Sequence, residues 1–437
     1  ARMLFPLLCG LLAAAPIWGP GIIATRGGGD SPFLLQRTMD MAESLRAGIF
    51  PVRWMSHAAY DLGYPFFSYY AAVPYYVSAA LTALGFNVLT AVQATQTLGF
   101  ILAAFAAALW ARRLLRSVSA RMLLVAAYTF APFHLVNIYV RGDSLSEFYA
   151  FVWFPLILWS LDRLVARPTG SRMAMVAIAH GGLIVTHNVS ALIFAPFALT
   201  YGLALAAHDG LRTRNGWPAA RSIWRSWVTV LSAFVLSFAL TAWFWLPAIV
   251  ETSYGQMGTE FIEGYFHYSQ HFRGLNLVQP SLTFDYRVAS TTAESGPFAM
   301  GFCQACAAVM GSLTTVIFLL KWRKGGETSV RYRLQHALML GELVLATAMI
   351  TPLSRPLWDH LPLLALAQFP WRFLSIQALF AATVTASLAE PAFLLTDRAK
   401  RWLVAAGISV LLVVTTLARL KPDRLNIVAG DVTWESL

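Results

Sequence analysis

The chain has 437 residues, of which 58% are hydrophobic and only 12% are charged, and its mean hydropathy is +0.60. This composition excludes a soluble globular protein and predicts an integral membrane protein, because many apolar stretches reach the roughly 20 residues that cross a bilayer as a helix. The net charge of +11 would suit a nucleic-acid partner, but the basic residues are scattered through short loops between apolar runs, so this class of partner is excluded as well.

The apolar runs predict an all-α integral membrane protein with about 11 transmembrane helices. Runs such as 97–110 and 404–417 are continuously apolar rather than alternating, which favours helices over the strands of a barrel. The first run has few charges before it and no clear small-residue cleavage site, so we expect a retained helix rather than a signal peptide. In chain order the expected spans are 3–24, 92–111, 119–139, 146–162, 173–187, 189–208, 226–247, 298–320, 334–352, 373–393 and 402–419.

The loops between these spans differ in charge from one face of the membrane to the other. The arginine- and lysine-rich loops all fall on one face, which the positive-inside rule assigns to the cytoplasm. We therefore expect a multi-pass protein of the cytoplasmic membrane, with its N-terminus inside and its C-terminus outside. The basic clusters on the inner face lie within 112–121, 163–172, 212–225, 321–333 and 398–401.

The apolar tract 63–84 conflicts with this topology if it is counted as a span, because every later loop would then change sides. We place it on the outer face as a juxtamembrane or re-entrant piece, since its tyrosines suit the headgroup level and its prolines interrupt a helix. The chain is then one transmembrane domain, 1–437. Its outer segments are a first loop with juxtamembrane helices at 25–91, a long loop at 248–297 and a tail at 420–437.

Two acids stand at the outer mouths of predicted helices and are the candidate catalytic residues. Asp30 follows the first span in Arg26-Gly-Gly-Gly-Asp30-Ser-Pro, and Asp143 precedes a later span in Arg141-Gly-Asp143-Ser-Leu-Ser-Glu147. A carboxylate shielded by apolar surroundings can act as a general base, and the alternative role of either acid is to cap the next helix. Glu147 lies inside a predicted span, where a charge is costly, so we assign it and the nearby Arg141 to substrate binding.

Two further polar strings lie at outer helix ends. His187-Asn188 is a polar turn between two short spans, which makes it either a tight hairpin or a substrate contact. Gln368-Phe-Pro-Trp371-Arg372 places an arginine at the entry to a span, where it can bind a phosphate bidentately or anchor the helix at the interface. We assign all five named residues to substrate binding.

The signs of a metal site are weaker. Glu260, Glu263, His267 and His271 have helical spacing in the long outer loop, and Asp359-His360 is a similar candidate, but charged residues in loops are usually solvated. The Cys303-Gln-Ala-Cys306 string has no second ligand pair, so we interpret both cysteines as packing residues. No residue is assigned to a metal and no cofactor is certain, and a divalent cation stays open as an alternative.

The order of these features along the chain resembles the GT-C superfamily of polytopic membrane glycosyltransferases, specifically the protein mannosyltransferase and aminoarabinose transferase type and the YfhO-like branch. Asp30 matches the catalytic acid of the family's first outer loop, and Asp143 matches an acid between its third and fourth spans. The Pro- and Tyr-rich start of 63–84 matches a juxtamembrane segment. His187 is similar to a polar turn of the family, and the string ending at Arg372 is similar to one in the YfhO-like branch.

Two departures from the family accompany this resemblance. Many members carry a paired acid or a histidine in the first loop, whereas Asp30 is flanked by glycines, which argues against a metal-assisted mechanism. Many members also continue into a soluble domain after the last span, and the short tail 420–437 predicts that such a domain is absent or truncated here.

The resemblance implies transfer of a sugar from a polyprenyl-phosphate donor to an acceptor on the outer face, with inversion at the sugar. It implies Asp30 as the general base, Arg372 on the phosphate with Arg141 in reserve, and Asp143 and His187 as orienting groups. The implied partners are the lipid-linked sugar, membrane lipids and other membrane subunits. Two alternatives remain: a non-catalytic GT-C-like scaffold subunit of a larger complex, and a transporter of lipid-linked glycans, for which Glu342 is the main acid at mid-membrane depth.

Overall fold

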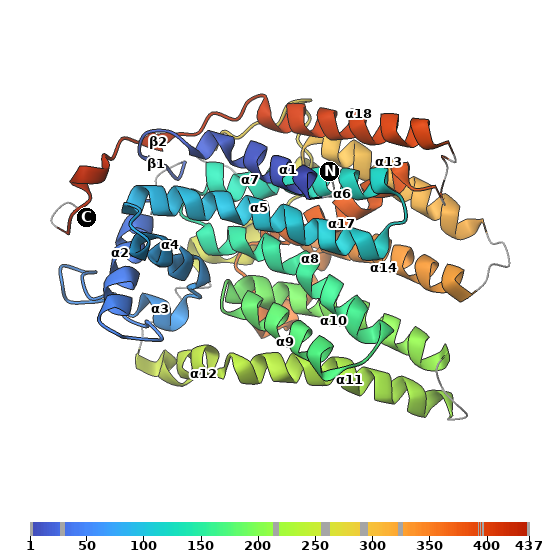
Figure 1. Cartoon of the computed structure of the whole chain (residues 1–437), viewed down its shortest axis with the longest axis horizontal. Helices are drawn as coiled ribbons and strands as arrows, with labels where there is room; N and C mark the ends of the chain where they lie inside the picture. The colour runs from blue at the N-terminus through green and yellow to red at the C-terminus, as the bar shows by residue number, and fades with distance from the viewer. Residues whose placement is uncertain are drawn as a thin grey trace.

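The computed structural model describes residues 3–26, 31–212, 218–254, 263–288, 296–321 and 327–434, apart from positions 392, 394 and 396. Long helices run side by side along the longest axis of the molecule (Figure 1). Each predicted span coincides with a helix. These helices are α1 (Leu4–Ala14), α5 (Val88–Leu114), α6 (Val118–Thr129) with α7 (Pro132–Tyr139), α8 (Leu145–Ala166), α9 (Gly170–Ile184), α10 (Asn188–Arg212), α11 (Ala219–Leu240), α13 (Phe302–Leu320), α14 (Glu327–Ile350), α17 (Leu374–Ala386) and α18 (Arg398–Leu417).

The described part of the chain contains eight helices that are long and apolar enough to cross a membrane, or nine if the bent pair Val330–Ile350 and Pro352–His360 is one span. The chain is therefore a multi-pass integral membrane protein, as its composition predicts. The count of about 11 is reached only with two shorter apolar helices. These are α9, with 15 residues, and the segment Leu4–Ile17.

The predicted first span is shorter in the structure than in the sequence analysis. Helix α1 passes into the 3-10 turn η1 (Ala15–Ile17), and the chain then extends through Gly19-Pro20-Gly21 into β1 (Ile22–Ile23). Gly21 has a φ of +66°, a left-handed conformation that glycine adopts without strain. Strand β1 pairs antiparallel with β2 (Arg424–Leu425), so the two far ends of the chain meet there.

Short helices gather at the end of the bundle where β1 and β2 lie (Figure 1). In the first loop, α2 spans Phe33–Arg46, and the tract 63–84 forms two separate helices, α3 (Phe66–Tyr69) and α4 (Val73–Ala83). Pro65 precedes α3 and Pro74 occupies the first turn of α4, where a missing N–H costs nothing. The helix α12 (Ala242–Val250) ends at the same end of the molecule.

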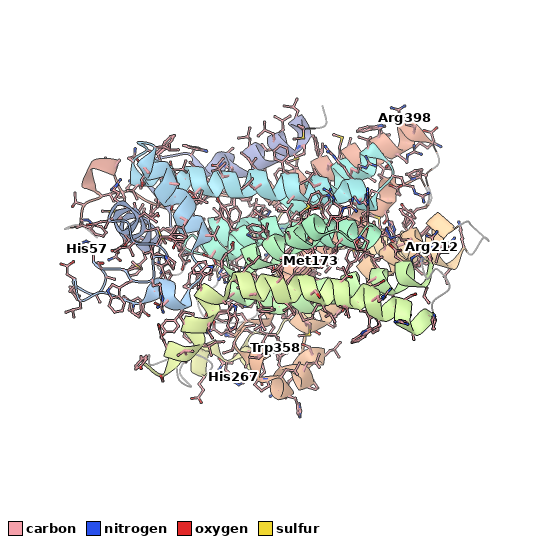
Figure 2. The ribbon with its side chains drawn as sticks, turned by 60° about the horizontal axis from the view of Figure 1, so that its bottom comes forward. His57, Met173, Arg212, His267, Trp358 and Arg398 are labelled. Carbon is pink, nitrogen blue, oxygen red and sulfur yellow. The ribbon has the colours of Figure 1, made fainter. Side chains whose placement is uncertain are left out.

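The opposite end of the bundle carries the basic clusters. Arg212 and Arg398 lie there, far from His57 at the other end (Figure 2). Side-chain caps begin the helices at this end: Ser117 accepts from the N–H of Ala120, and Asp397 accepts from that of Lys400. The two ends of the bundle therefore differ in charge, because the basic clusters lie at one of them. The membrane face at which each end lies remains a prediction.

Helix α8 lies at the centre of the fold. It packs on α5, α9 and α10, and most of its residues are buried. Small residues allow close helix contacts elsewhere in the bundle, as membrane helices require. At Gly311 in α13, an added Cβ would lie 2.1 Å from the carbonyl oxygen of Val384 in α17, so only glycine permits that approach. The two ends of α8 reach the two polar regions of the molecule described below.

Candidate functional site

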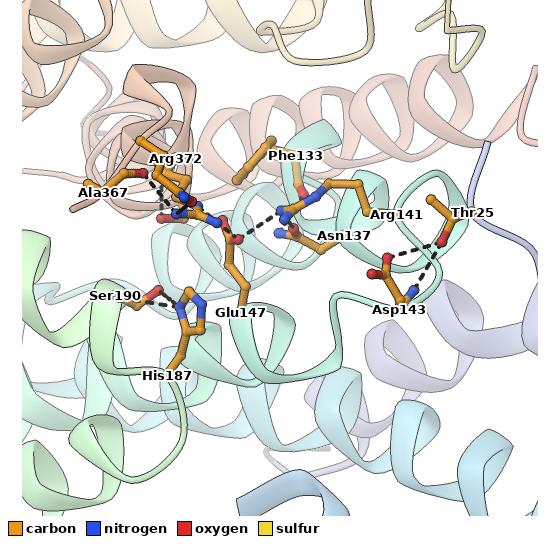
Figure 3. A network of polar contacts seen from close by, with 12 residues as sticks. Thr25, Phe133, Asn137, Arg141, Asp143, Glu147, His187, Ser190, Ala367 and Arg372 are labelled. Atoms are coloured by element: carbon orange, nitrogen blue, oxygen red, sulfur yellow. Dashed lines mark hydrogen bonds and ion pairs between the residues drawn. The ribbon is translucent and has the colours of Figure 1, made fainter. Parts of the chain in front are cut away.

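Glu147 is the centre of a buried charge cluster at the end of the bundle that holds α2 to α4 (Figure 3). It lies in the first turn of α8, where the helix dipole favours a negative charge, and it is 1% exposed. Its Oε2 accepts a hydrogen bond of 2.8 Å from Nη1 of Arg141 and lies 3.4 Å from Nε of Arg372. Its Oε1 has no hydrogen-bond partner among the described residues.

Arg141 reaches Glu147 from the turn between α7 and α8. Its Nη1 also donates to Oδ1 of Asn137 at 2.8 Å, and its guanidinium lies 4.9 Å from the centre of the Trp371 ring. Burial disfavours the charged guanidinium, but the Glu147 carboxylate outweighs this effect and raises the pKa of Arg141 above its usual value. Arg141 is therefore a fixed cation, held on three sides.

Arg372 comes from the 3-10 helix η8 (Pro370–Phe373), which leads into α17. Its Nη1 donates to the carbonyl oxygen of Ala367 at 2.8 Å and approaches Oε1 of Gln368 at 3.4 Å. Gln368 adopts a left-handed conformation, with a φ of +60°, which is uncommon for a residue with a side chain. This strained turn directs the Arg372 side chain towards Glu147. The residues from Gln368 to Arg372 therefore act together to position one guanidinium group.

His187 lies beside the two arginines, in the turn before α10. Its Nδ1 accepts from the backbone N–H of Ser190 at 3.2 Å and lies 2.7 Å from Oγ of Ser190, which assigns the ring proton to Nε2. Burial lowers the pKa of His187 to about 3, and the charges of Arg372 and Arg141 act in the same direction, against that of Glu147. The imidazole is neutral at pH 7 and offers one N–H donor.

Asp143 lies apart from Glu147, on the other side of Arg141 (Figure 3). Its Oδ1 accepts from Oγ1 of Thr25 at 3.0 Å, and Thr25 is bonded in turn to Oγ of Ser31 at 2.8 Å. Gly142 makes this contact possible, because a Cβ there would lie 2.5 Å from the carbonyl oxygen of Ile23. The predicted acid Asp143 is thus tied to the segment that follows the first helix.

Asp30, the other predicted catalytic acid, lies outside the described residues. The residues on both sides of its short segment are described. Arg26 donates its backbone N–H to the carbonyl oxygen of Val140 at 2.8 Å, and Ser31 contacts Thr25. Arg26 and Ser31, which flank this segment, therefore both lie next to the turn that carries Arg141 and Asp143.

Two further predicted residues, Trp371 and Asn188, differ in whether they contact the charge cluster. Trp371 is buried, stacks on Phe298 and Phe369, and supports Arg141. Asn188 is exposed, and its amide donates to the carbonyl oxygen of Tyr69 at 3.4 Å. Asn188 therefore joins α10 to α3 rather than entering the charge cluster.

The structure adds Arg37 to the site, a residue that the sequence analysis does not single out. It lies on α2, where Nη1 donates to the Tyr75 hydroxyl at 3.2 Å and the guanidinium lies 4.2 Å from the centre of the Phe66 ring. The charge of Asp143 acts on Arg37 as it does on Arg141. The sequence offers no signal for this residue, because a single arginine on a helix carries no motif.

Two guanidinium groups in this cluster have unused donors. Arg141 contacts Asn137 and Glu147 through Nη1, whereas Arg372 donates through Nη1 and its Nε forms only an ion pair with Glu147 at 3.4 Å. Within the described residues, neither Nη2 group has a protein acceptor. Two cations and one carboxylate leave a net positive charge in a dry setting. Such an arrangement suits a phosphate, which accepts several N–H donors at once.

The metal candidates do not form a site in the described part of the chain. No three His, Cys, Asp or Glu side chains gather there closely enough to hold an ion. His267 bonds through Nδ1 to Ser269, His271 bonds through Nε2 to the carbonyl oxygen of Tyr265, and Asp359 accepts from Tyr268. Glu260 lies outside the described residues.

The chain matches no protein-family model, and no curated protein is similar to it in sequence. Its structure is similar to archaeal oligosaccharyltransferase AglB from Archaeoglobus fulgidus, solved with an inhibitory peptide and a dolichol-phosphate, with a TM-score of 0.52 and 12% identity over 94% of this chain and 55% of that one. The same oligosaccharyltransferase with Zn and sulfate gives 0.50 and 15% over 95% and 53%. Arabinofuranosyltransferase AftD from Mycobacteria gives 0.51 and 14% over 97% and 28%.

This chain spans about half the length of the archaeal enzyme and less than a third of AftD. One is an oligosaccharyltransferase and the other an arabinofuranosyltransferase, and at such low identity the likeness concerns the fold alone. That fold is the one the sequence resemblance implies. The chain has the polytopic, all-α membrane fold of the GT-C glycosyltransferases.

Proposed function

We propose that the chain is a membrane glycosyltransferase that moves a sugar from a polyprenyl-phosphate donor to an acceptor on the outer face of the cytoplasmic membrane. The observation that carries this proposal is the pair of buried arginines around Glu147, each with an unused Nη2 group. The fold supports it, because the similar solved structures are glycosyltransferases and one of them holds a dolichol-phosphate.

In this mechanism Arg372 and Arg141 bind the phosphate of the donor. Glu147 holds both side chains in place through Oε2. As the bond between the sugar C1 and the phosphate oxygen breaks, negative charge grows on the phosphate, and the two guanidinium groups stabilise it. A phosphate stabilised in this way leaves without a proton donor.

The acceptor hydroxyl attacks C1 from the opposite side, which inverts the configuration at the sugar. The proton of that hydroxyl passes to Asp30 as general base, so the products are the glycosylated acceptor, the free polyprenyl phosphate and a protonated carboxyl. Asp143 and the neutral His187 orient the acceptor and the sugar, and Gln368 and Trp371 position the arginines. No metal ion takes part in this scheme.

Asp30→Asn tests the assignment of the base. With a radiolabelled lipid-linked sugar and purified protein, we expect transfer to fall about 100-fold or more, which is the range general-base catalysis supplies. The matched control is Asp61→Asn, an acid of the same outer region whose side chain is 79% exposed and contacts His57. The control should keep its activity. Near-normal transfer by Asp30→Asn would remove Asp30 from the mechanism.

A further inference from the structure

A second polar region lies at the basic end of the bundle. A pocket of about 510 Å³ opens there between α5, α8 and α9, and four arginines line it. Arg112 and Arg113 come from the last turn of α5, Arg163 from the last turn of α8, and Arg172 from the first turn of α9. The ring of Trp159 forms part of the wall.

The positive charge of this pocket is not neutralised by the described residues around it. The nearby carboxylate of Asp162 is bonded to Nε of Arg113 at 2.5 Å, but it also accepts from Nη2 of Arg331 at 2.8 Å and from Nε2 of Gln335 at 3.0 Å. One carboxylate shared in this way leaves Arg112, Arg163 and Arg172 without a counter-ion in the described chain.

Two of these arginines also have most of their donors unused. Arg163 contacts only the face of Trp159, at 4.8 Å from the ring centre, and Arg112 donates only to Sδ of Met3, at 3.9 Å, within the described chain. Arg172 uses Nη1 on the carbonyl oxygens of Arg163 and Arg167. The pocket therefore presents several N–H donors from three helices.

Other arginines at this end of the bundle behave differently. Arg333 donates to the carbonyl oxygens of Phe318, Leu319 and Lys321, which closes the end of α13. Arg121 does the same for Leu115 after α5. Helix capping explains the positions of these two side chains, and the positive-inside rule explains why basic residues are frequent at this end of the bundle. Neither rule explains why Arg112 and Arg163 converge on one pocket with their donors free.

We propose that this pocket binds a phosphate group, and that the phosphate belongs to the headgroup of an anionic membrane lipid. Arg112 and Arg163 lie in the last turns of two membrane-crossing helices, which is the depth of the headgroups. Trp159, one turn earlier in α8, suits the interface just below. Basic pockets between helix ends on the inner face are known sites for such lipids. A soluble phosphate ester offers the same chemistry from water.

The test measures lipid binding to the purified full chain by native mass spectrometry. Phosphatidylglycerol, phosphatidylcholine and glycerol 3-phosphate are titrated separately. We expect phosphatidylglycerol to bind, and Arg112→Gln with Arg163→Gln to weaken its affinity roughly fivefold for each arginine removed. The matched control for each single variant is Arg167→Gln, which removes one charge from the end of α8 but does not line the pocket.

Three outcomes decide the proposal. Equal loss of affinity in Arg167→Gln and in the single variants Arg112→Gln and Arg163→Gln would overturn it, because the general charge of the basic end would then explain the binding. Equal binding of phosphatidylcholine would also overturn it. Tight binding of glycerol 3-phosphate alone would retain the phosphate site and reject the lipid as its source. If the double variant does not fold, Arg112→Gln alone is compared with Arg167→Gln, because Arg112 is exposed.

Discussion

Each end of helix α8 carries a buried carboxylate that is shared by two arginines, but the two carboxylates differ in their hydrogen bonds. Near its start, Glu147 is shared by Arg141 and Arg372, and near its end, Asp162 is shared by Arg113 and Arg331. Both carboxylates are 1% exposed. The difference lies in how completely each group is satisfied.

At Asp162, both carboxylate oxygens are bonded, and Gln335 adds a third donor. At Glu147, only Oε2 is bonded, and Oε1 has no hydrogen-bond partner in the described chain. A buried carboxylate bonded through both oxygens holds helices together, whereas a buried oxygen without a partner calls for an explanation such as a ligand site. We infer that the carboxylate of Asp162 is structural and that of Glu147 is functional, and the following variants test that contrast.

The largest expected effect is on stability at Asp162. Asp162→Asn leaves Arg113 and Arg331 with a neutral partner in a buried site, so the free energy of unfolding should fall by about 3–5 kcal/mol. Urea or SDS titration in detergent would measure it. Polyprenyl phosphate at about 100 times its dissociation constant should stabilise Asp162→Asn by about 2–3 kcal/mol, as it does the wild type, because the phosphate site at the other end of α8 is unchanged. In Glu147→Gln the same concentration should give a larger gain than in the wild type, because the bound phosphate also replaces the missing charge. A gain in Glu147→Gln equal to that in Asp162→Asn would end the contrast.

The next effect is on activity. Arg372→Gln should reduce sugar transfer about 10²–10³-fold, the usual loss when one donor to the developing charge is removed. Arg331→Gln, at the other end of α8, makes the same change in charge and should keep transfer within about twofold at a temperature where it is folded. Steady-state rates with a lipid-linked sugar measure both. A similar loss in the two variants would show that activity follows stability alone.

A smaller effect concerns pH at His187. Its folded-state pKa of about 3 lies below the usual value of 6.5, so stability is fully present above pH 6.5 and falls as the pH is lowered towards 3. One proton gives a slope of about 1.4 kcal/mol per pH unit. Unfolding measured from pH 7 to pH 4 should show a shallower slope in His187→Gln than in the wild type. Parallel curves would contradict a buried neutral imidazole.

The smallest effect is expected at Glu342, in α14. Both of its carboxyl oxygens are buried without a hydrogen-bond partner in the described chain. Glu342→Met should therefore raise the free energy of unfolding by about 1–3 kcal/mol and leave sugar transfer unchanged. A loss of transfer, or of lipid-linked glycan transport in proteoliposomes, would assign a role to this acid and favour the transporter alternative.

The helices of this fold are readable from the sequence because lipid permits few backbone structures. Every predicted span has a helix at its position, even where α9 is too short to be recognised by length. The end of the first span is predicted wrongly, because the apolar pattern continues through Ile22 and Ile23 while Pro20 and Gly21 have already turned the chain into a strand. Hydropathy does not distinguish a buried strand from the end of a helix.

The site was harder to predict than the fold. Glu147, Arg141, His187 and Arg372 are brought together as polar residues at helix mouths, which the sequence could suggest. The sequence does not predict which of these residues form ion pairs, because the pairs depend on how the turn before α8 packs against η8. Arg141 and Asp143 are two positions apart in the sequence, yet the hydrogen-bonded partner of Arg141 is Glu147, and Asp143 bonds to Thr25.

The pairing of β1 with β2 has a consequence for biogenesis. Arg26, which precedes the segment of Asp30, donates to the carbonyl oxygens of Tyr286 and Lys421 and forms an ion pair with Asp423 at 3.1 Å. The start of the loop after α1 is therefore fixed by residues that leave the ribosome almost 400 positions later. This loop cannot adopt its final position until the last helix has been inserted, so an unfinished chain has no assembled site.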